Sequence, residues 1–277
     1  MNIIFEHNKF KFWETDFILN NVLPKGKVRQ IYSDNLERID SYNSTFVGDN
    51  AFIFSSRLHY FENIIPVLEH IKPKIIILLS DEFVLENRWM YNLCGNYCEL
   101  FLRNYHHPNY EYTENTLHIP LGYATGCKRY ISFDKKYTWS FMGEFKEDRE
   151  KMISVFSKFE NHFVGNKIAR DKMCEIYSQS VFVPCGRGNS SLDCFRLYEA
   201  SMNGAIPVVV GSKEEVESTF KYEQNPPWIF AKSWKEAYNN CEDLLNDKNK
   251  LKEMQINIFS WWKNRMSSVR NRVSQVK

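Results

Sequence analysis

The stretch VFVPCGRGNSSLDCFRLYEASMNGAIPVVVG, residues 181–211, decides the fold class of this chain. It opens on an apolar run, residues 181–184, and continues into a loop rich in glycine and serine. Apolar residues then recur at helical spacing over residues 192–203, and a second apolar run fills residues 205–210. A buried strand, a glycine loop, a helix and another buried strand are typical of one βαβ unit in a parallel sheet.

The same alternation of strands and helices extends over most of the chain. Apolar runs predict further strands at residues 51–54, 74–79, 99–102, 137–142 and 162–165. Amphipathic stretches predict helices over residues 58–71 (with a kink at Pro66), 82–94, 149–159, 170–178, 232–247 and 249–270. The alternation therefore predicts an α/β protein with two Rossmann-like domains facing each other across a cleft. The expected domains are residues 1–133, residues 134–255 and a C-terminal helix, 256–277, packing back toward the first.

The loop after residues 181–184 contains the residue types that hold a phosphate group. In open parallel sheets, ligands bind at the carboxyl ends of the strands, where loops lead into helix N-termini. Glycine lets backbone N–H groups approach a ligand, and a helix start presents unpaired donors. The predicted diphosphate site comprises Arg187, Gly188, Asn189, Ser190, Ser191 and Arg196. Glu199 is predicted to accept hydrogen bonds from ribose hydroxyls. Arg196, three residues earlier on the same helix face, either reaches phosphate or holds Glu199 in place. Glycine loops between a strand and a helix also occur in α/β proteins generally.

The full combination of these elements resembles the C-terminal signature of the exostosin-like glycosyltransferases, family GT47. The resemblance rests on the proline and glycine loop, on DCFRLYEA at residues 193–200 and on GAIPVVV at residues 204–210. Phe141, Gly143 and Arg149 also resemble the first strand and turn of the family's nucleotide-sugar domain, in which the arginine is a candidate phosphate ligand.

This resemblance is specific over residues 118–211, which include the interdomain-like segment IPLGY, and loose over residues 1–117. Animal and plant members of the family usually carry an N-terminal membrane anchor and are longer than this chain of 277 residues. Compact members without an anchor are encoded by large algal viruses, and one of those is a xylosyltransferase. The chain is similar to these viral members in size.

The resemblance implies a GT-B fold, an inverting reaction and a UDP-sugar donor, with xylose as the best candidate sugar. An inverting transfer needs positive groups that stabilise the leaving UDP. That role is expected of Arg149, Arg187, Arg196 and a helix start near Ser190 and Ser191. No metal or other cofactor is expected, since these groups supply the charge and the chain contains no Asp-x-Asp motif.

An inverting transfer also needs a base that takes the proton of the acceptor hydroxyl. The expected candidates are Asp81 and Glu82, because they follow the apolar run 74–79 at the carboxyl end of a strand. Asp81 has an alternative role as an ordinary helix N-cap. Residues that follow two other strands are expected on the acceptor side: Arg57, His59, His106 and His107.

Composition narrows the class of partner. A net charge of +2 is too small to favour nucleic acid. The sequence has no apolar leader and no apolar run of 18 residues, which predicts a cytoplasmic protein without a membrane anchor. If the chain is viral, the compartment is the host cytoplasm. The seven cysteines are expected to be reduced. The expected acceptor is an oligosaccharide or a glycoprotein glycan. The alternatives are a phosphorylase or epimerase in the same fold and a non-catalytic nucleotide-sugar or glycan-binding module.

Overall fold

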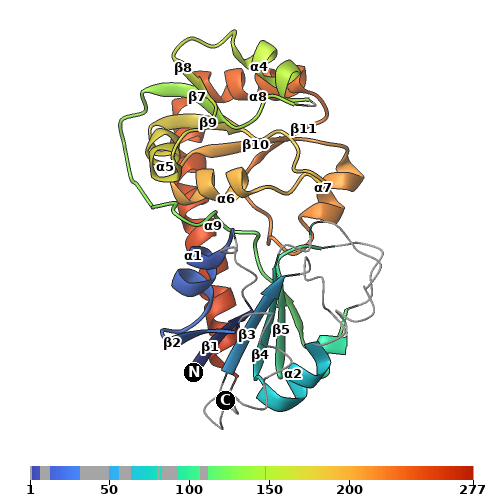
Figure 1. The fold of residues 1–277 in the computed structure, drawn as a ribbon. Coiled ribbons are helices and arrows are strands. Elements are labelled where there is room, and N and C mark those ends of the chain that lie inside the picture. Colours follow the sequence, from blue (N-terminus) through green and yellow to red (C-terminus); the bar gives the residue numbers. More distant parts are fainter. Residues whose placement is uncertain are drawn as a thin grey trace. The chain divides into compact units, whose positions relative to one another are not determined.

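Two parallel β-sheets organise the protein, whose structure is a computed structural model (Figure 1). The structure describes residues 2–6, 13–31, 50–55, 64–79, 82, 93–106, 112–146 and 148–276. Each sheet belongs to one of two compact units. The N-terminal unit comprises residues 1–120 and 268–277, and the C-terminal unit comprises residues 121–267. The division falls between Pro120 and Leu121, whereas the sequence suggested a boundary near residue 133.

The sheet of the N-terminal unit has the strand order β2-β1-β3-β4-β5-β6, and every described pairing in it is parallel. Its strands are β1 (Asn2–Glu6), β2 (Lys27–Ile31), β3 (Asn50–Ser55), β4 (Ile75–Leu79), β5 (Leu100–Arg103) and β6 (Thr116–His118). All of β4 is buried, because the run IIILL lies inside the sheet and is covered on both faces.

Short helices accompany this sheet. The first, α1 (Thr15–Phe17), continues as the π-helical turn η1 (Ile18–Val22), and α2 (Ile64–Ile71) precedes β4. Pro66 lies in the first turn of α2 as described, where a proline is tolerated because its missing N–H has no intrahelical partner there. Most of the helix predicted over residues 82–94 lies outside the described residues.

The sheet of the C-terminal unit has the order β11-β10-β9-β7-β8, again with parallel pairings (Figure 1). Its strands are β7 (Tyr137–Met142), β8 (His162–Gly165), β9 (Ser180–Pro184), β10 (Ile206–Val210) and β11 (Ile229–Ala231). Its helices are α4 (Arg149–Phe156), α5 (Arg170–Ser178), α6 (Phe195–Met202), α7 (Lys213–Thr219), α8 (Trp234–Asn246) and α9 (Lys248–Ser274). The predicted α/β class with parallel sheets is confirmed in both units.

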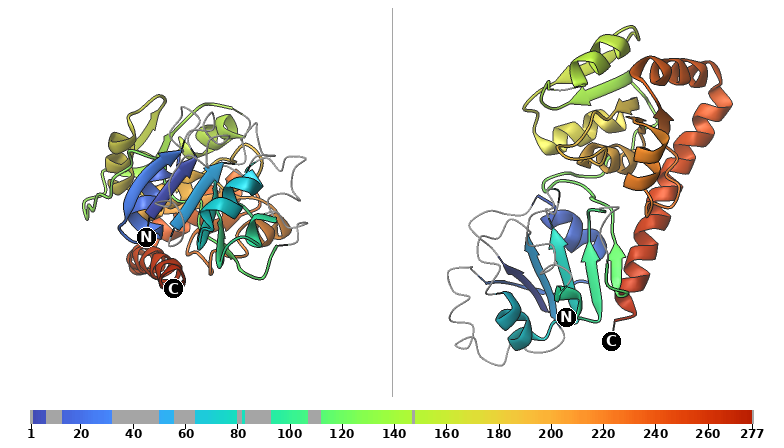
Figure 2. Two further views of the ribbon diagram at one scale, coloured as in Figure 1. Left: turned by 60° about the horizontal axis from the view of Figure 1, so that its bottom comes forward. Right: turned by 90° about the vertical axis from the view of Figure 1, so that its right-hand side faces the viewer.

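The last helix, α9, is one continuous helix, as Figure 2 shows. Its residues up to Ser267 belong to the C-terminal unit and those from Ser268 to the N-terminal unit. Trp261 donates from its indole Nε1 to the carbonyl oxygen of Glu223 at 2.8 Å, which fixes the helix to the C-terminal unit. No helix among the described residues has the length and apolarity needed to span a membrane.

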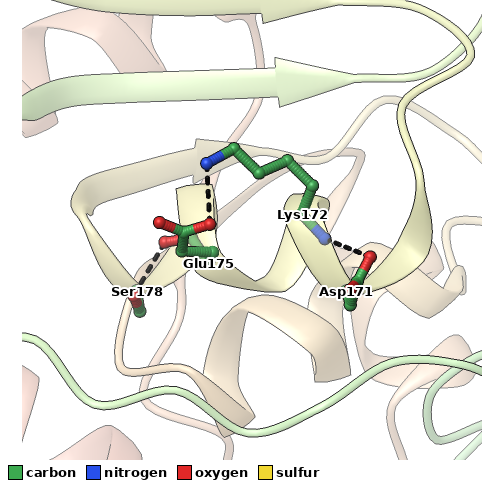
Figure 3. Close-up of polar contacts among 4 residues, drawn as sticks. All are labelled: Asp171, Lys172, Glu175 and Ser178. Carbon is green, nitrogen blue, oxygen red and sulfur yellow. Dashed lines mark hydrogen bonds and ion pairs between the residues drawn. The ribbon is translucent and has the colours of Figure 1, made fainter.

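Helix α5 shows how the exposed face of the C-terminal unit is built (Figure 3). Lys172 Nζ lies 2.7 Å from Glu175 Oε2, and the backbone N–H of Lys172 donates to Asp171 Oδ1 at 2.8 Å. Ser178 Oγ donates to the carbonyl oxygen of Glu175 at 2.7 Å near the end of the helix. An exposed ion pair contributes little stability, so Lys172 is a suitable control position for charge substitutions.

Candidate functional site

The candidate site lies at the carboxyl edge of the sheet in the C-terminal unit. Two loops leave this edge: residues 143–148 follow β7, and residues 185–194 follow β9 and lead into α6. Because the strands are parallel, both loops emerge at the same end of the sheet. Every residue predicted from the sequence to bind the donor lies on one of these loops or at the start of α4 or on α6.

Arg196, on the first turn of α6, lies at the centre of this edge. Its Nη2 donates to the carbonyl oxygen of Gly186 at 3.1 Å, and its guanidinium carbon lies 5.5 Å from the centroid of the Phe141 ring. Its Nε is buried and has no hydrogen-bond partner among the described residues. A Cβ at position 143 would lie in tight contact with Arg196, 3.3 Å from its Nη1, and Gly143 has a φ of +155°, which side chains rarely adopt. Glycine therefore leaves room for the guanidinium.

The environment of Arg196 keeps it positively charged. Burial opposes the charge, but nearby groups that can carry negative charge, Cys194 first and then Tyr177, favour it more, so the pKa of Arg196 lies above its ordinary value. A half-buried guanidinium at this edge can donate strong hydrogen bonds to an anion, because charge-assisted hydrogen bonds are about twice as strong as neutral ones.

Arg149 joins the two loops. It is 5% exposed, and its Nη1 donates to the carbonyl oxygen of Glu144 at 3.1 Å while its Nη2 donates to that of Arg187 at 2.7 Å. Gly186 makes this possible, since a Cβ there would lie 2.6 Å from Arg149 Cγ. The sequence identified Arg149 as a candidate phosphate ligand, whereas its guanidinium contacts in the structure include a carbonyl group of each loop.

The tip of the 185–194 loop is tied to its surroundings by polar contacts. Arg187 forms an ion pair with Glu215 of α7, and Lys146 Nζ donates to Asn189 Oδ1 at 2.8 Å. Gly188 N–H donates to the carbonyl oxygen of Ser191 at 2.9 Å. A Cβ on Gly188 would lie 2.3 Å from the backbone oxygen of Asp193, so this glycine is required by the loop's own path.

Helix α6 begins later than the sequence suggested. Its first residue is Phe195 and its N-cap is Cys194, without a side-chain capping bond. Ser190 and Ser191 therefore lie in the loop, and the predicted helix start beside them is wrong. Ser191 Oγ instead accepts from the backbone N–H of Asp193 at 3.2 Å, which helps to shape the loop ahead of the helix.

Glu199 is fully buried on α6 and binds the segment that leads into β7. Its Oε1 accepts from the backbone N–H of Ala124 and from the Cys127 thiol, each at 3.2 Å. One turn further, Asn203 Oδ1 accepts from the N–H of Tyr130 at 2.7 Å. Glu199 Oε2 has no hydrogen-bond partner among the described residues. The carboxylate predicted to face ribose thus holds a backbone segment with one oxygen and has the other oxygen unpaired.

Phe145 adds an aromatic surface that the sequence analysis missed. It follows β7 at the carboxyl edge, is 49% exposed, and its ring centroid lies 6.3 Å from that of Phe141. The Arg196 guanidinium also lies by the Phe141 ring, so the buried Phe141 ring has both the exposed Phe145 ring and a cation beside it. The signal that could have found Phe145 is its position directly after the predicted strand 137–142.

The residues predicted on the acceptor side belong to the N-terminal unit. Arg57, His59, Asp81 and His107 lie outside the described residues, and Glu82 is half-buried. His106 is half-buried just beyond β5, with its ring centroid 5.2 Å from that of His118 and 6.0 Å from that of Tyr112. His118 and Tyr112 were not predicted, and a histidine that ends a short polar strand gave little sequence signal.

The described residues contain no group of three or more His, Cys, Asp or Glu side chains placed to hold a metal ion.

Comparison with known proteins gives a result only at the level of structure. No family model and no curated protein matches the chain. HepE from Anabaena, solved with UDP-glucose, is 10% identical over 99% of this chain and 98% of its own, with a TM-score of 0.57. An alpha-glucosyltransferase in complex with UDP-glucose and DNA containing an abasic site is 11% identical over 94% of both chains, with a TM-score of 0.54. TarM is 9% identical over 87% of this chain and 58% of its own, with a TM-score of 0.53.

Identities near one residue in ten establish the fold alone. Together with the two parallel sheets, these likenesses confirm the predicted fold class. The chain has the GT-B fold, the two-domain α/β architecture of these glycosyltransferase structures.

Proposed function

We propose that the protein is a glycosyltransferase that uses a UDP-sugar donor, and that its C-terminal unit binds the nucleotide. The observation that carries the proposal is the half-buried Arg196 guanidinium, held at the carboxyl edge of the sheet beside Gly143 by its bond to the carbonyl oxygen of Gly186. Structures with the same fold were solved with UDP and with UDP-glucose. A diphosphate is the ligand best matched to this position.

In this proposal, Arg196 and Arg187 stabilise the negative charge that develops on the departing UDP, together with N–H groups of the 185–194 loop. Arg149 acts as a positioning residue, because its bonds to two loop carbonyls fix the loops relative to each other. Glu199 remains the residue proposed to accept from a ribose hydroxyl, while its Oε1 retains the 124–127 segment. Asn189, Ser190 and Ser191 complete the loop surface.

From the resemblance to family GT47 we propose a more specific reaction. It is an inverting transfer of xylose to a hydroxyl of an oligosaccharide or glycoprotein glycan. The acceptor hydroxyl attacks the anomeric carbon as the bond to UDP breaks, and its proton passes to a base. Asp81 and Glu82 are the proposed bases. His106, which lies among the residues that the structure describes, is proposed as an alternative base. Arg57, His59 and His107 are the further residues proposed for acceptor binding. Transfer without a resident metal is proposed because arginine supplies the charge.

The proposal is tested with the full chain and a panel of UDP- and GDP-sugars. Binding raises the melting temperature by mass action, so UDP-sugars should raise it more than GDP-sugars at equal concentration. The same UDP-sugars should be hydrolysed slowly without acceptor, and EDTA should leave that rate unchanged. UDP binding without any hydrolysis or transfer would indicate a binding module instead. An absence of UDP binding would reject the nucleotide site altogether.

Phe145 is proposed to stack on the uracil ring, and its substitution gives a separate test. Base–aromatic stacking is worth about 1–3 kcal/mol, so Phe145→Ala should weaken UDP binding about tenfold. Phe145→Tyr keeps the ring and should bind UDP as the unsubstituted protein does. Pyrophosphate lacks a base, and its affinity should be equal in all three proteins. If Phe145→Ala weakened UDP and pyrophosphate binding equally, the substitution would have disturbed the loop, and the stacking role would be rejected.

A further inference from the structure

Residues 128–136, KRYISFDKK, carry the most exposed apolar side chains of the C-terminal unit outside the candidate site. Phe133 is 94% exposed and Ile131 is 56% exposed. Single exposed apolar residues are ordinary on protein surfaces, but a phenylalanine with almost its whole surface in water, two residues from an exposed isoleucine, is not. We call residues 128–136 the basic-apolar segment.

This segment is held in place at both ends. Before its midpoint, the N–H of Tyr130 donates to the buried Asn203 at 2.7 Å. Near its end, Lys135 Nζ donates to the carbonyl oxygens of Ser178 at 2.7 Å and Gly204 at 3.1 Å. Burial lowers the pKa of Lys135 to about 8, which agrees with an inward-facing amine. The segment therefore has fixed ends, and its exposed residues project from an ordered base.

The apolar residues lie at and just before a bend in the chain. Ser132 Oγ donates to the carbonyl oxygen of Asp134 at 2.8 Å, and this bond spans Phe133. The bend directs Phe133 outward, and at 94% exposure its ring is available to enter a lipid layer.

The basic-apolar segment lies at the opposite end of the sheet from the candidate site. It leads into the first residue of β7, and Lys135 contacts the ends of α5 and α6, which precede β9 and β10. These are the amino ends of parallel strands, whereas Arg196 and Phe145 lie at the carboxyl ends. A partner bound to the segment would leave the proposed nucleotide site open.

Exposed cations surround the apolar tip. Lys128, Arg129 and Lys136 are exposed, and Asp134 is the one acidic residue of the segment. The Arg129 guanidinium carbon lies 5.7 Å from the centroid of the Phe259 ring of α9, which keeps this cation at the surface. Apolar side chains at a tip with lysine and arginine around them match a lipid layer with anionic headgroups.

We propose that the basic-apolar segment docks the protein on an anionic membrane surface, with Phe133 and Ile131 entering the boundary between headgroups and acyl chains. Lipid phosphates then lie against Lys128, Arg129 and Lys136. A membrane matches this surface better than a protein partner does. Lysine is depleted in protein interfaces, and a projecting tip has no groove into which a partner's side chains could pack. A membrane also matches it better than a sugar does, since the aliphatic side chain of Ile131 offers no stacking face. The inference does not depend on the proposed glycosyltransferase activity.

The test is sedimentation of the full chain with vesicles of phosphatidylcholine alone or with added phosphatidylglycerol. The protein should bind the anionic vesicles, less so at higher salt, and bind neutral vesicles weakly. Ile131→Ser with Phe133→Ser should lower the partition coefficient about tenfold, because the apolar insertion is removed. Ile131→Leu with Phe133→Leu should retain binding. Lys128→Glu with Lys136→Glu should remove most of the preference for anionic lipid.

Phe145→Ser is the matched control, as it removes an exposed phenylalanine from the other edge of the same sheet, and it should leave vesicle binding unchanged. Each serine variant should keep the melting temperature of the unsubstituted protein within a few degrees, since the side chains that it removes are about half exposed or more. The proposal is overturned if the unsubstituted protein ignores anionic vesicles or if the serine pair binds them equally. It is also overturned if that pair instead abolishes a concentration-dependent dimer, which would make the segment a contact between copies of the chain.

Discussion

Replacing Arg196 with alanine should weaken UDP binding about a hundredfold. The proposed contact is a charge-assisted hydrogen bond from a partly enclosed guanidinium, worth about 1.5–3 kcal/mol, and the substitution also removes the Nη2 bond to Gly186 that helps to shape the 185–194 loop. Isothermal titration calorimetry with UDP measures the change. Arg196→Lys should fall between the two proteins, because an ammonium keeps the charge but not the planar geometry of two adjacent donors.

Lys172→Ala is the control for the removal of one positive charge. Its side chain is 58% exposed on α5 and its ion-pair partner is Glu175, so UDP affinity should not change. The melting temperature of Arg196→Ala distinguishes the removal of a ligand contact from a disordered loop. Unchanged UDP affinity in a folded Arg196→Ala protein would remove this residue from the nucleotide site.

Replacing Arg265 with methionine should lower the free energy of unfolding by about 3–5 kcal/mol at neutral pH. Arg265 Nε lies 3.3 Å from Glu223 Oε2, and both side chains are buried. Methionine removes the cation and leaves a buried carboxylate without its counter-charge. Denaturant unfolding of the two proteins measures the difference. Glu223→Gln together with Arg265→Met should recover most of this stability, because no uncompensated charge then remains at that pair.

The pH dependence of this effect follows from the buried carboxyls. Burial raises the pKa of Glu223 above its ordinary 4.5 and that of nearby Asp193 well above 3.8. A folded-state pKa above the unfolded value means that the native state binds more protons, so these groups reduce stability as the pH rises through that window. In Arg265→Met the deficit should shrink as the pH falls, because Glu223 then takes up a proton and no longer carries an uncompensated buried charge. A deficit that is the same at pH 4 and pH 7 would contradict this role for the pair.

The fold of the C-terminal unit was largely predictable because its buried strands are apolar runs that helices interrupt. The predicted ranges of β7, β8 and α5 agree with the structure residue for residue. The predicted start of α6 was wrong because Leu192 fits the helical periodicity. In the structure Leu192 belongs to the loop before the helix and is buried there. A Cβ on Gly211 would lie 2.6 Å from Leu192 Cδ1, so this leucine packs on the end of β10.

Elements without an apolar pattern were missed. Helix α7 has no buried residue, and its only sequence signal is Ser212, whose Oγ accepts from the N–H of Glu215 at 3.2 Å. That pairing is the first half of a capping box and could have predicted the helix start. Strand β6 is short and half polar, and it lies in the stretch that the sequence analysis assigned as irregular.

The sequence predicts which loops lie at this edge of the sheet, but not the contacts that their side chains make. Strand ends and glycines identify which loops meet at an edge, since this follows from parallel topology. The sequence does not tell whether an arginine on such a loop faces a ligand or a neighbouring carbonyl group, because that depends on distances between segments far apart in the chain. Arg149 and Glu199 are the examples: one bonds to two loop carbonyls and the other to the 124–127 segment.

The absence of a side chain at Gly186 has a consequence for protein engineering. Because Gly186 has no Cβ, Arg149 occupies the space beside it, and the carbonyl oxygen of Arg187 accepts a hydrogen bond from the Arg149 guanidinium. A graft of residues 185–194 into another scaffold would therefore transfer an incomplete module, lacking the cation that locks it. The smallest portable module pairs that loop with residues 143–149, and any library that varies the proposed donor site should diversify the two loops jointly while keeping position 186 as glycine.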